Sequence, residues 1–349
     1  MRWAPSSRRP ANARSGRFRR PVRTAAYGGR VTQTLPFGTW PSPLSARDVA
    51  AGSHPVDAGR YVGEEIWWLE RMPAEGGRSA VRRLTADAVA DGGRPETVLP
   101  APWDVRSRVH EYGGGAWTVD DAGGLCFVDG RDQRVWAGGV GQEPSPLTPE
   151  DATARYGDLV RDGAHLLAVR EVHGDAAVPR REIVSIPVDG SAVADPSRIV
   201  AVVGGSDFLA YPAVSPDGAH LAWIAWNHPD MPWDATELRV GRRGADGVVA
   251  SWTALAGGPG VSVLQPEWDG VDALVHSSDR TGRWNLVRTG LDGRSAPIAP
   301  CDADTGGPLW NLGVRWFAPL ADGRIVAVRT DGSDVLVLLD CPEVRGLPA

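Results

Sequence analysis

Seven histidines are the first residues to consider, because histidine is widely used for metal binding and for proton transfer near neutral pH. They are scattered, and no pair has the spacing of a helical zinc site: His54, His110, His165, His173, His220, His228 and His276. The three cysteines, Cys126, Cys301 and Cys341, form no CxxC pair and are odd in number. They predict buried free thiols in a reducing compartment.

Two other patterns have the appearance of ligand sites. Asp302 and Asp304 begin like a calcium loop, but Gly313 stands at the twelfth position, where a bidentate glutamate is required. The run Gly113-Gly114-Gly115 lies inside a strand pattern, where close backbone approach is a better explanation than phosphate binding. No P-loop or dinucleotide fingerprint occurs in the sequence. We therefore predict no metal site and no cofactor.

A polar cluster precedes one predicted strand and has two interpretations. It consists of Arg106, Arg108, His110, Glu111 and Tyr112. In the first interpretation, Arg108 or Glu111 faces a cavity and contacts the termini of a substrate. In the second, the charges form a structural ion pair between neighbouring repeats, because such networks are as common as functional sites. The sequence leaves both open.

A second candidate segment is the long polar loop from His228 to Asp234, which reads HPDMPWD. Loops held on a rigid scaffold often carry function, so His228, Trp233 and Asp234 are candidates for a substrate cavity. The alternative is that Trp233 only covers a neighbouring repeat. No residue of the chain is assigned a catalytic role.

The elements that must position these segments are repeated strands. Six central apolar runs recur: 66–69, 125–128, 166–169, 221–226, 273–275 and 324–328. Markers at Trp67, Phe127, Leu167, Leu221, Ala273 and Arg324 are separated by 60, 40, 54, 52 and 51 residues. A period of about 50 residues suits one four-stranded propeller blade. We predict an all-β protein, a β-propeller of four-stranded blades with five complete units and an incomplete sixth, Pro308–Leu339.

Turn residues support the same fold. Ser215-Pro216-Asp217-Gly218 is expected to reverse the chain before the run 221–226, since proline and glycine preset the turn dihedrals. Asp189-Gly190 and Asp292-Gly293 predict hairpins. The only helix expected is a short one over Leu44–Ala51, and the absence of long amphipathic helices argues against a parallel α/β sheet.

Charge is distributed unevenly. Nine of the 37 basic residues, all arginine, lie in residues 1–30, whereas the first acidic residue is Asp48. Residues 31–349 carry 28 arginines against 43 acidic residues, a net charge of −15, so we expect no nucleic-acid partner. We predict a disordered Arg-rich tail over 1–34, a propeller domain over 35–340 and a coil over 341–349. No apolar run approaches the ~20 residues that span a bilayer, and no apolar export region follows the arginines, so we expect a cytoplasmic protein without a membrane partner.

Several stretches, in order, carry a resemblance to a family. They are 109–116 (VHEYGGGA), 132–136 (DQRVW), 155–159 (RYGDL), 215–218, 228–238, 257–268, 277–288 and 306–310. The chain from about residue 35 to 335 resembles the N-terminal propeller of S9-family serine peptidases, in particular the dipeptidyl aminopeptidase/acylaminoacyl-peptidase-like branch of the prolyl oligopeptidase group. The resemblance implies a seven-bladed parent ring, short peptides as substrates, and an α/β-hydrolase domain that supplies Ser, Asp and His.

The sequence departs from that family at the catalytic motif. Four serines follow a G-x pattern, namely Ser79, Ser206, Ser262 and Ser295, and none has glycine two residues later. The strained nucleophile turn requires small residues on both sides. We therefore expect a truncated, non-catalytic propeller that gates and sizes substrates, with the hydrolase domain missing or separately encoded. Two alternatives remain: a stand-alone TolB-like or WD40-like binding scaffold, and a propeller enzyme with its own convergent carboxylates.

Overall fold

The computed structural model describes residues 34–120, 122–176 and 178–341. Most of the predicted tail (1–34) and coil (341–349) lies outside these residues. The chain divides into two compact units, Met1–Ala46 and Arg47–Ala349. In the described part of the first unit, the amide of Thr39 donates to the carbonyl of Pro36 at 3.2 Å, closing a turn. Every strand formed by the described residues lies in the second unit.

Six antiparallel sheets make up the second unit, and in each the strands follow one another in chain order from the inside outward. The first two sheets are β1 (Val56–Val62), β2 (Glu65–Met72), β3 (Arg78–Thr85), β4 (Glu96–Thr97), and β5 (Trp117–Val119), β6 (Leu125–Val128), β7 (Val135–Gly138), β8 (Ser145–Pro146). The third and fourth are β9 (Ala154–Asp162), β10 (His165–Val172), β11 (Arg180–Pro187), β12 (Val200–Val203), and β13 (Phe208–Val214), β14 (His220–Trp226), β15 (Glu237–Arg242), β16 (Trp252–Gly257).

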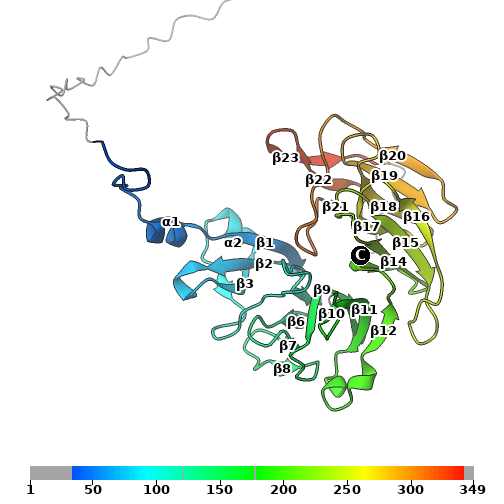
Figure 1. The fold of residues 1–349 in the computed structure, drawn as a ribbon, viewed down its shortest axis with the longest axis horizontal. Coiled ribbons are helices and arrows are strands. Elements are labelled where there is room, and N and C mark those ends of the chain that lie inside the picture. Colours follow the sequence, from blue (N-terminus) through cyan, green and yellow to red (C-terminus); the bar gives the residue numbers. More distant parts are fainter. Residues whose placement is uncertain (1–33, 121, 177, 342–349) are drawn as a thin grey trace, which may run out of the picture. The chain divides into compact units, whose positions relative to one another are not determined.

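The fifth sheet again has four strands and the sixth has three. They are β17 (Val263–Asp269), β18 (Ala273–Ser278), β19 (Asn285–Gly290), β20 (Ser295–Ile298), and β21 (Phe317–Pro319), β22 (Ile325–Thr330), β23 (Asp334–Leu339). The sheets are arranged as blades around a common centre (Figure 1), so the chain is a β-propeller. This confirms the predicted fold, including an incomplete sixth blade. The seven-bladed parent ring stays a prediction.

The apolar runs predicted from the sequence are the second strands of their blades: β2, β6, β10, β14, β18 and β22. Helices are few and short: α1 (Ala46–Gly52), α2 (Ala86–Ala90), and the 3-10 turns η1 (Pro73–Glu75), η2 (Ser191–Val193) and η3 (Pro196–Arg198). The predicted helix over Leu44–Ala51 is therefore confirmed as α1, shifted slightly along the chain. Among the described residues, no helix has the length and apolar character needed to cross a membrane.

Of the three turns predicted from the sequence, two are confirmed and one is wrong. Gly218 adopts a left-handed φ of 72° and its amide donates to Ser215 at 2.8 Å, which confirms the turn between β13 and β14. Asp292-Gly293 likewise joins β19 to β20. The hairpin predicted at Asp189-Gly190 is wrong, because η2 and η3 separate β11 from β12 there. The Asp189 carboxylate instead accepts a hydrogen bond from the amide of Ser191 at 2.9 Å, which starts the first 3-10 turn.

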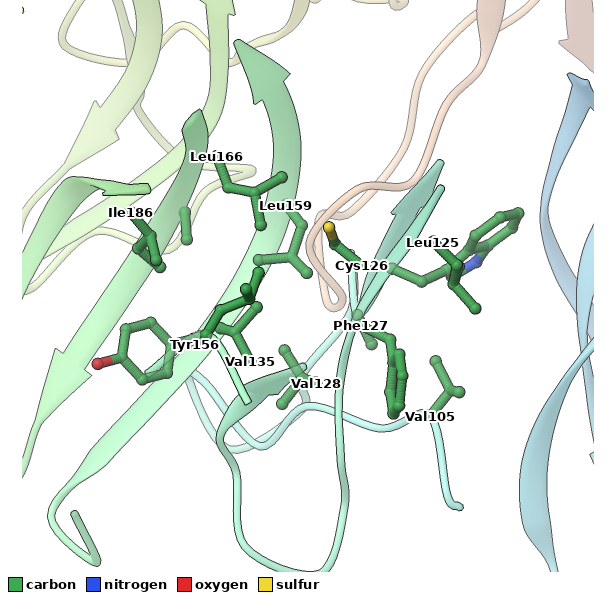
Figure 2. Close-up of a cluster of buried hydrophobic side chains, with 14 of the residues drawn as sticks. Val105, Leu125, Cys126, Phe127, Val128, Val135, Tyr156, Leu159, Leu166 and Ile186 are labelled. Atoms are coloured by element: carbon green, nitrogen blue, oxygen red, sulfur yellow. The ribbon is translucent and has the colours of Figure 1, made fainter. Parts of the chain in front are cut away.

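Blades pack face to face through apolar side chains. Figure 2 shows part of one such cluster, where Cys126 and Val128 of β6 face Leu159 and Tyr156 of β9, while Phe127 points the other way, toward Val105. Trp67, Trp117 and Trp223 are fully buried in these layers, as expected for a residue with a large flat surface. Cys126 and Cys341 are buried free thiols, as predicted, and Cys301 is half-buried. Burial raises the pKa of Cys126 to about 11, so this thiol is unreactive.

The innermost strands share a repeated irregularity. Ala58, Asp158, Tyr211 and Gln265 have φ values of 52°, 50°, 54° and 51°, and the pairing register shifts beside each of them. Such β-bulges redirect side chains. Asp158 uses its redirected carboxylate to accept the amide hydrogen of Tyr211, on the next blade, at 2.5 Å. The bulges therefore tie neighbouring blades together around the centre.

The outer strand β23 predicts self-association. Among the described residues it pairs only with β22, and Val335, Leu336 and Leu338 on it are exposed. An apolar strand edge offers unpaired backbone groups to other chains. We expect the chain to elute in size-exclusion chromatography as oligomers whose size grows with concentration. Val335→Lys should shift it toward the monomer.

A matched control comes from Val271, which is 47% exposed against 54% for Val335 but lies in the turn between β17 and β18. Val271→Lys should leave the elution profile unchanged. A sharp monomer peak for the unmodified chain at all concentrations would contradict the prediction.

Candidate functional site

The meander of each blade sends particular loops to the same end of the ring. In a four-stranded antiparallel meander, the loop between strands two and three and the connection to the next blade lie at one end. The two segments singled out in the sequence are of these kinds: 98–116 joins β4 to β5, and 227–236 joins β14 to β15. Segment 299–316 joins β20 to β21. We call the surface formed by these three segments the loop face.

Glu111 is held on the loop face by a neighbouring blade. Its Oε1 accepts a hydrogen bond from Nη1 of Arg155, the second residue of β9, at 2.8 Å. The same Nη1 donates to the carbonyl oxygen of Arg108 at 3.1 Å. The hydrogen bond and charge of Arg155 hold the pKa of Glu111 below its usual value, and the Glu111 side chain is 72% exposed. Glu111 is thus a fixed, ionised and accessible carboxylate.

Behind Glu111 lies a buried ion-pair network. Glu171, at the end of β10, accepts from Arg181 Nε at 2.7 Å and lies 3.6 Å from Arg155. His173 Nε2 lies 2.7 Å from the same carboxylate. Ligand atoms of Glu111, Glu171 and His173 lie within 4.8 Å of one another, which resembles a metal site. Because Arg155 and Arg181 already neutralise the carboxylates, the arrangement is that of an interblade ion-pair network.

The backbone that presents Glu111 is tightly constrained. His110 and Glu111 have φ values of 52° and 66°, and glycines 113–115 also have positive φ. A Cβ on Gly113 would lie 2.1 Å from the carbonyl oxygen of Ser107, and one on Gly114 would lie 2.2 Å from that of Leu312. The predicted close backbone approach is confirmed. The amide of Leu312 donates to Gly113 at 2.9 Å, so this turn is anchored to the segment leading into the sixth blade.

His110 itself is part of the packing. Its ring meets the edges of Phe208 (5.3 Å between ring centres) and Trp226 (6.0 Å). Burial, and secondarily the charge of Arg181, lowers the pKa of His110 to about 3. It is therefore a neutral, half-buried ring at pH 7 and a poor general base.

His228 reaches the same aromatic group from the other predicted segment. Its ring lies 5.0 Å from that of Phe208, and its amide donates to Asp207 Oδ2 at 2.9 Å. His228 also lines a cavity of about 150 Å³ together with Asp230, Glu237 and Arg239. The two sequence-predicted segments are therefore connected through Phe208.

Trp233 provides a second connection between the segments. Its ring lies 4.7 Å from that of Trp310, and Trp310 in turn lies 5.1 Å from Tyr112. Tyr112 and Trp310 are exposed and Trp233 is half-buried. Tyr112, one member of this aromatic patch of Tyr112, Trp233 and Trp310, directly follows Glu111 in the chain. The loop face thus offers both an apolar surface and a negative charge.

The remaining two predicted residues contribute less to this arrangement. Asp234 Oδ2 accepts the amide hydrogen of Met231 at 3.0 Å, so it stabilises its own turn. The backbone amide of Arg108 donates to Gln133 Oε1 at 2.7 Å, while its exposed guanidinium has no hydrogen-bond or ion-pair partner in the described part of the chain. Arg108 shares its contact to Arg155 with Glu111, and its positive charge adds slightly to the lowering of the pKa of Glu111.

Sequence reasoning missed Arg155, Glu171, Arg181 and Trp310. One signal was present: Glu171 and Arg181 stand directly opposite each other in the pairing of β10 with β11. Opposite charges at facing positions of a hairpin are a recognisable pattern once the register is known. Nothing local to segment 299–316 indicates that Trp310 contacts Tyr112.

This propeller is similar to parts of several solved peptidase structures. A puromycin-hydrolyzing peptidase of Mycobacterium tuberculosis is similar at 38% identity and a TM-score of 0.79, over 91% of this chain and 50% of that chain. Puromycin hydrolase gives 38% identity and a TM-score of 0.80, with the same coverage. Prolyl oligopeptidase B from Galerina marginata shares the fold, at 11% identity and a TM-score of 0.58, over 83% of this chain and 43% of that one.

The chain spans about half the length of the two puromycin-hydrolysing enzymes. No protein-family model matches it, and neither does any curated protein. The similarity runs through nearly the whole propeller, in agreement with the resemblance seen in the motifs. The structural neighbours of this propeller are therefore puromycin hydrolase and prolyl oligopeptidases, peptidases of the S9 family, over about half of their length.

Proposed function

We propose that this propeller is the non-catalytic, substrate-sizing part of an S9-type serine peptidase that acts on short peptides. The observation that carries the proposal is the 38% identity to puromycin hydrolase over 91% of this chain, within a sequence that contains no G-x-S-x-G motif. A rigid ring admits flexible chains and excludes folded proteins. The hydrolase domain, as partner, would supply the Ser-Asp-His groups.

The loop face is the surface we assign to contact with that substrate. Glu111 is ionised and accessible, and the aromatic patch of Tyr112, Trp233 and Trp310 belongs to the same loop face. A carboxylate suits an amino group, and aromatic rings suit an apolar side chain. Free thiols at Cys126, Cys301 and Cys341 support the further proposal that the protein is cytoplasmic.

The test is an activity assay on the purified chain. We expect no release of chromophore from short chromogenic peptides, because the chain contains no nucleophile turn. Isothermal titration should nevertheless detect binding of the same peptides, weakened about tenfold by Glu111→Gln through loss of a charged hydrogen bond. Turnover that a serine-directed phosphonate inhibits would refute the non-catalytic role.

A further inference from the structure

A second cavity lies at the opposite end of the ring from the loop face. In each blade, the turns that join the first strand to the second and the third to the fourth lie at that end. The cavity has a volume of about 280 Å³ and is formed near the β13–β14, β15–β16 and β19–β20 turns of two neighbouring blades. We call it the far-end cavity, and its lining includes His220, Val240, Arg242, Thr253, Leu255 and Leu291.

The charge of the far-end cavity differs from that of two other cavities. The cavity on the loop face is lined in part by Asp230 and Glu237, and one of about 170 Å³ between the innermost strands β9, β13 and β17 is lined in part by Asp158 and Glu267. No aspartate or glutamate lines the far-end cavity, whereas Arg242 does. Since the whole chain carries a net charge of −6, a cavity with an arginine and no acid indicates a local preference for anions.

The protein does not neutralise Arg242 itself. Arg242 is exposed at the end of β15, and its guanidinium forms no hydrogen bond or ion pair with any described residue. Its neighbour Arg243 differs, because it forms an ion pair with Asp162 at 2.5 Å. A guanidinium presents two parallel donors that match a carboxylate. Arg242 therefore keeps both donors for a ligand.

Strand pairing places much of the lining on one face of the fourth blade. His220 stands opposite Arg242 in the pairing of β14 with β15, and Val240 stands opposite Thr253 in the pairing of β15 with β16. Residues directly opposite each other share a face of the sheet, and so do residues two apart on one strand. The four side chains therefore lie together, with Arg242 nearest the end of the blade.

Other polar groups of the lining also lack partners. The hydroxyl groups of Ser251 and Thr253 form no hydrogen bond with the residues that the structure describes. His220 Nδ1 is buried without a hydrogen-bond partner, and the centre of its ring lies 6.2 Å from that of Trp268. Because no hydrogen bond fixes the imidazole, the ring can turn toward a ligand. The far-end cavity thus holds two hydroxyl donors in addition to the guanidinium.

Much of the remaining lining is apolar. Val240 is buried, while Leu255 and Leu291 are half-buried and pack against the hydrophobic core between the blades. A cavity of this volume suits a small molecule rather than a folded partner. A ligand that satisfies both parts of the lining carries one negative group on a short apolar body.

The surroundings favour a single negative charge over a double one. Asp217 lies in the turn before β14, where its Oδ1 accepts the amide hydrogen of Ala219 at 3.1 Å. Asp292 directly follows Leu291 in the β19–β20 turn. With a carboxylate in each of these turns, a dianion such as phosphate would meet more repulsion than a carboxylate.

We propose that the far-end cavity binds a small organic monocarboxylate with an apolar body. Arg242 pairs with the carboxylate, the hydroxyls of Ser251 and Thr253 donate to it, and the apolar body lies against Val240 and the two leucines. The site is separate from the loop face and does not depend on the proposed function. A free organic acid and the carboxyl terminus of a peptide share this chemistry.

The experiment is isothermal titration of the full chain with hexanoate, hexanamide and acetate. Hexanoate is expected to bind at least tenfold more tightly than hexanamide, which lacks the charge, and at least tenfold more tightly than acetate, which lacks the apolar body. Equal affinity for hexanoate and hexanamide, tighter binding of inorganic phosphate than of hexanoate, or no binding of hexanoate would overturn the proposal.

A further probe, N-acetyl-alanyl-leucine, distinguishes the two sources of the carboxylate. Its acetylated end has no amino group for Glu111 on the loop face. If it binds more tightly than hexanoate, the carboxyl terminus of a peptide is the ligand, and if it binds more weakly, a free organic acid is.

Variants locate the effect at Arg242. Arg242→Gln should abolish the preference for hexanoate over hexanamide, and Arg242→Lys should retain part of it, since lysine keeps the charge without the paired donors. Thr253→Val should weaken hexanoate binding about threefold through loss of one hydrogen bond. Arg71→Gln is the control, because Arg71 is also exposed and without a side-chain partner among the described residues, but lies on β2 of the first blade. An Arg242→Gln protein that still prefers hexanoate would contradict the assignment.

Stability separates a binding role from a structural one. Because Arg242 is exposed and unpaired within the protein, Arg242→Gln should leave the melting temperature of the ligand-free chain within about two degrees. A fall of many degrees would show that the arginine supports the fold instead. Since these measurements involve neither hydrolysis nor the loop face, a failed carboxylate preference leaves the peptidase proposal intact, and a failed peptidase proposal leaves the carboxylate site standing.

Discussion

Replacing Gly114 by alanine is expected to lower the free energy of unfolding by about 4 kcal/mol or more. Gly114 has a φ of 105°, and a Cβ there would lie 2.2 Å and 2.5 Å from the carbonyl oxygen and amide nitrogen of Leu312. These are backbone atoms, so no side-chain rotation relieves the clash. Gly114 forms a parallel bridge with Leu312, which is itself buried. The substitution would therefore break the contact that holds segment 299–316, which leads into the sixth blade.

Gly258 provides the matched control. Its φ is 102°, almost the same as that of Gly114, but no atom lies within 4 Å of the position that its Cβ would take. Gly258→Ala should therefore show only the backbone cost, about 1–2 kcal/mol. Urea unfolding followed by tryptophan fluorescence measures both variants. Similar losses for the two would mean that the approach of Leu312 to Gly114 does not constrain the fold.

The same pair of variants bears on the loop face. Because Gly113–Leu312 contacts hold segment 98–116 against segment 299–316, Gly114→Ala should also separate Tyr112 from Trp310. The expected result is weaker peptide binding in any folded fraction, whereas Gly258→Ala should bind peptides like the unmodified chain.

Acidification from pH 8 to pH 5 should lower the free energy of unfolding by about 4 kcal/mol through two histidines, His110 and His276. Burial lowers the pKa of His110 to about 3 and that of His276 to about 4. Both values lie below the unfolded value of about 6.5. As the pH falls through 6.5, these histidines become protonated in the unfolded chain but stay neutral in the folded chain. The stability that they contribute is therefore fully present above pH 6.5, and it is lost as the pH falls toward 4 for His276 and toward 3 for His110.

The size of the expected loss follows from proton linkage. At pH 5 each histidine lowers the free energy of unfolding by about 2 kcal/mol relative to pH 8. The raised pKa of buried Asp158 acts in the opposite direction, because its folded form takes up a proton more readily than the unfolded form. It offsets part of the loss. The lowered pKa of Glu111 adds to the loss only at more acidic pH, where an unfolded glutamate becomes protonated.

Urea unfolding at pH 8, 7, 6 and 5 checks this prediction. His276→Gln removes one titrating group while retaining a hydrogen-bonding side chain near Thr289 Oγ1, which lies 3.0 Å from His276 Nε2, and it should halve the pH dependence. His165→Gln, at an exposed position of β10, should leave it unchanged. An unfolding free energy that stays level from pH 8 to pH 5 would show that the two rings become protonated without unfolding the chain.

The sequence was sufficient for the architecture because strand signals are local. Alternation along runs such as 221–226, and turns such as Ser215–Gly218, depend only on residues a few positions apart. The period of about 50 residues then revealed the blades, and the three-strand sixth blade appeared as an incomplete repeat. The hairpin prediction at Asp189-Gly190 was wrong because a long 3-10 connection can begin with the same two residues as a tight turn.

Part of the candidate site was also visible in the sequence. The polar cluster around Glu111 and the loop around Trp233 stood out by their residue types, and the glycine run at 113–115 correctly indicated close backbone approach. Whether Arg108 or Glu111 meets a substrate was left open, and the two residues prove to share a contact with Arg155.

Only the tertiary structure decided which of these segments meet. Tyr112 contacts Trp310, and the amide of Leu312 donates to Gly113, although about 200 residues separate each pair in the sequence. Such contacts depend on how the blades close around a centre, and on bulges that redirect side chains such as Asp158. Propensity and periodicity specify each blade by itself, whereas the ring geometry brings Asp158, Tyr211 and Glu267, from three different blades, to one cavity.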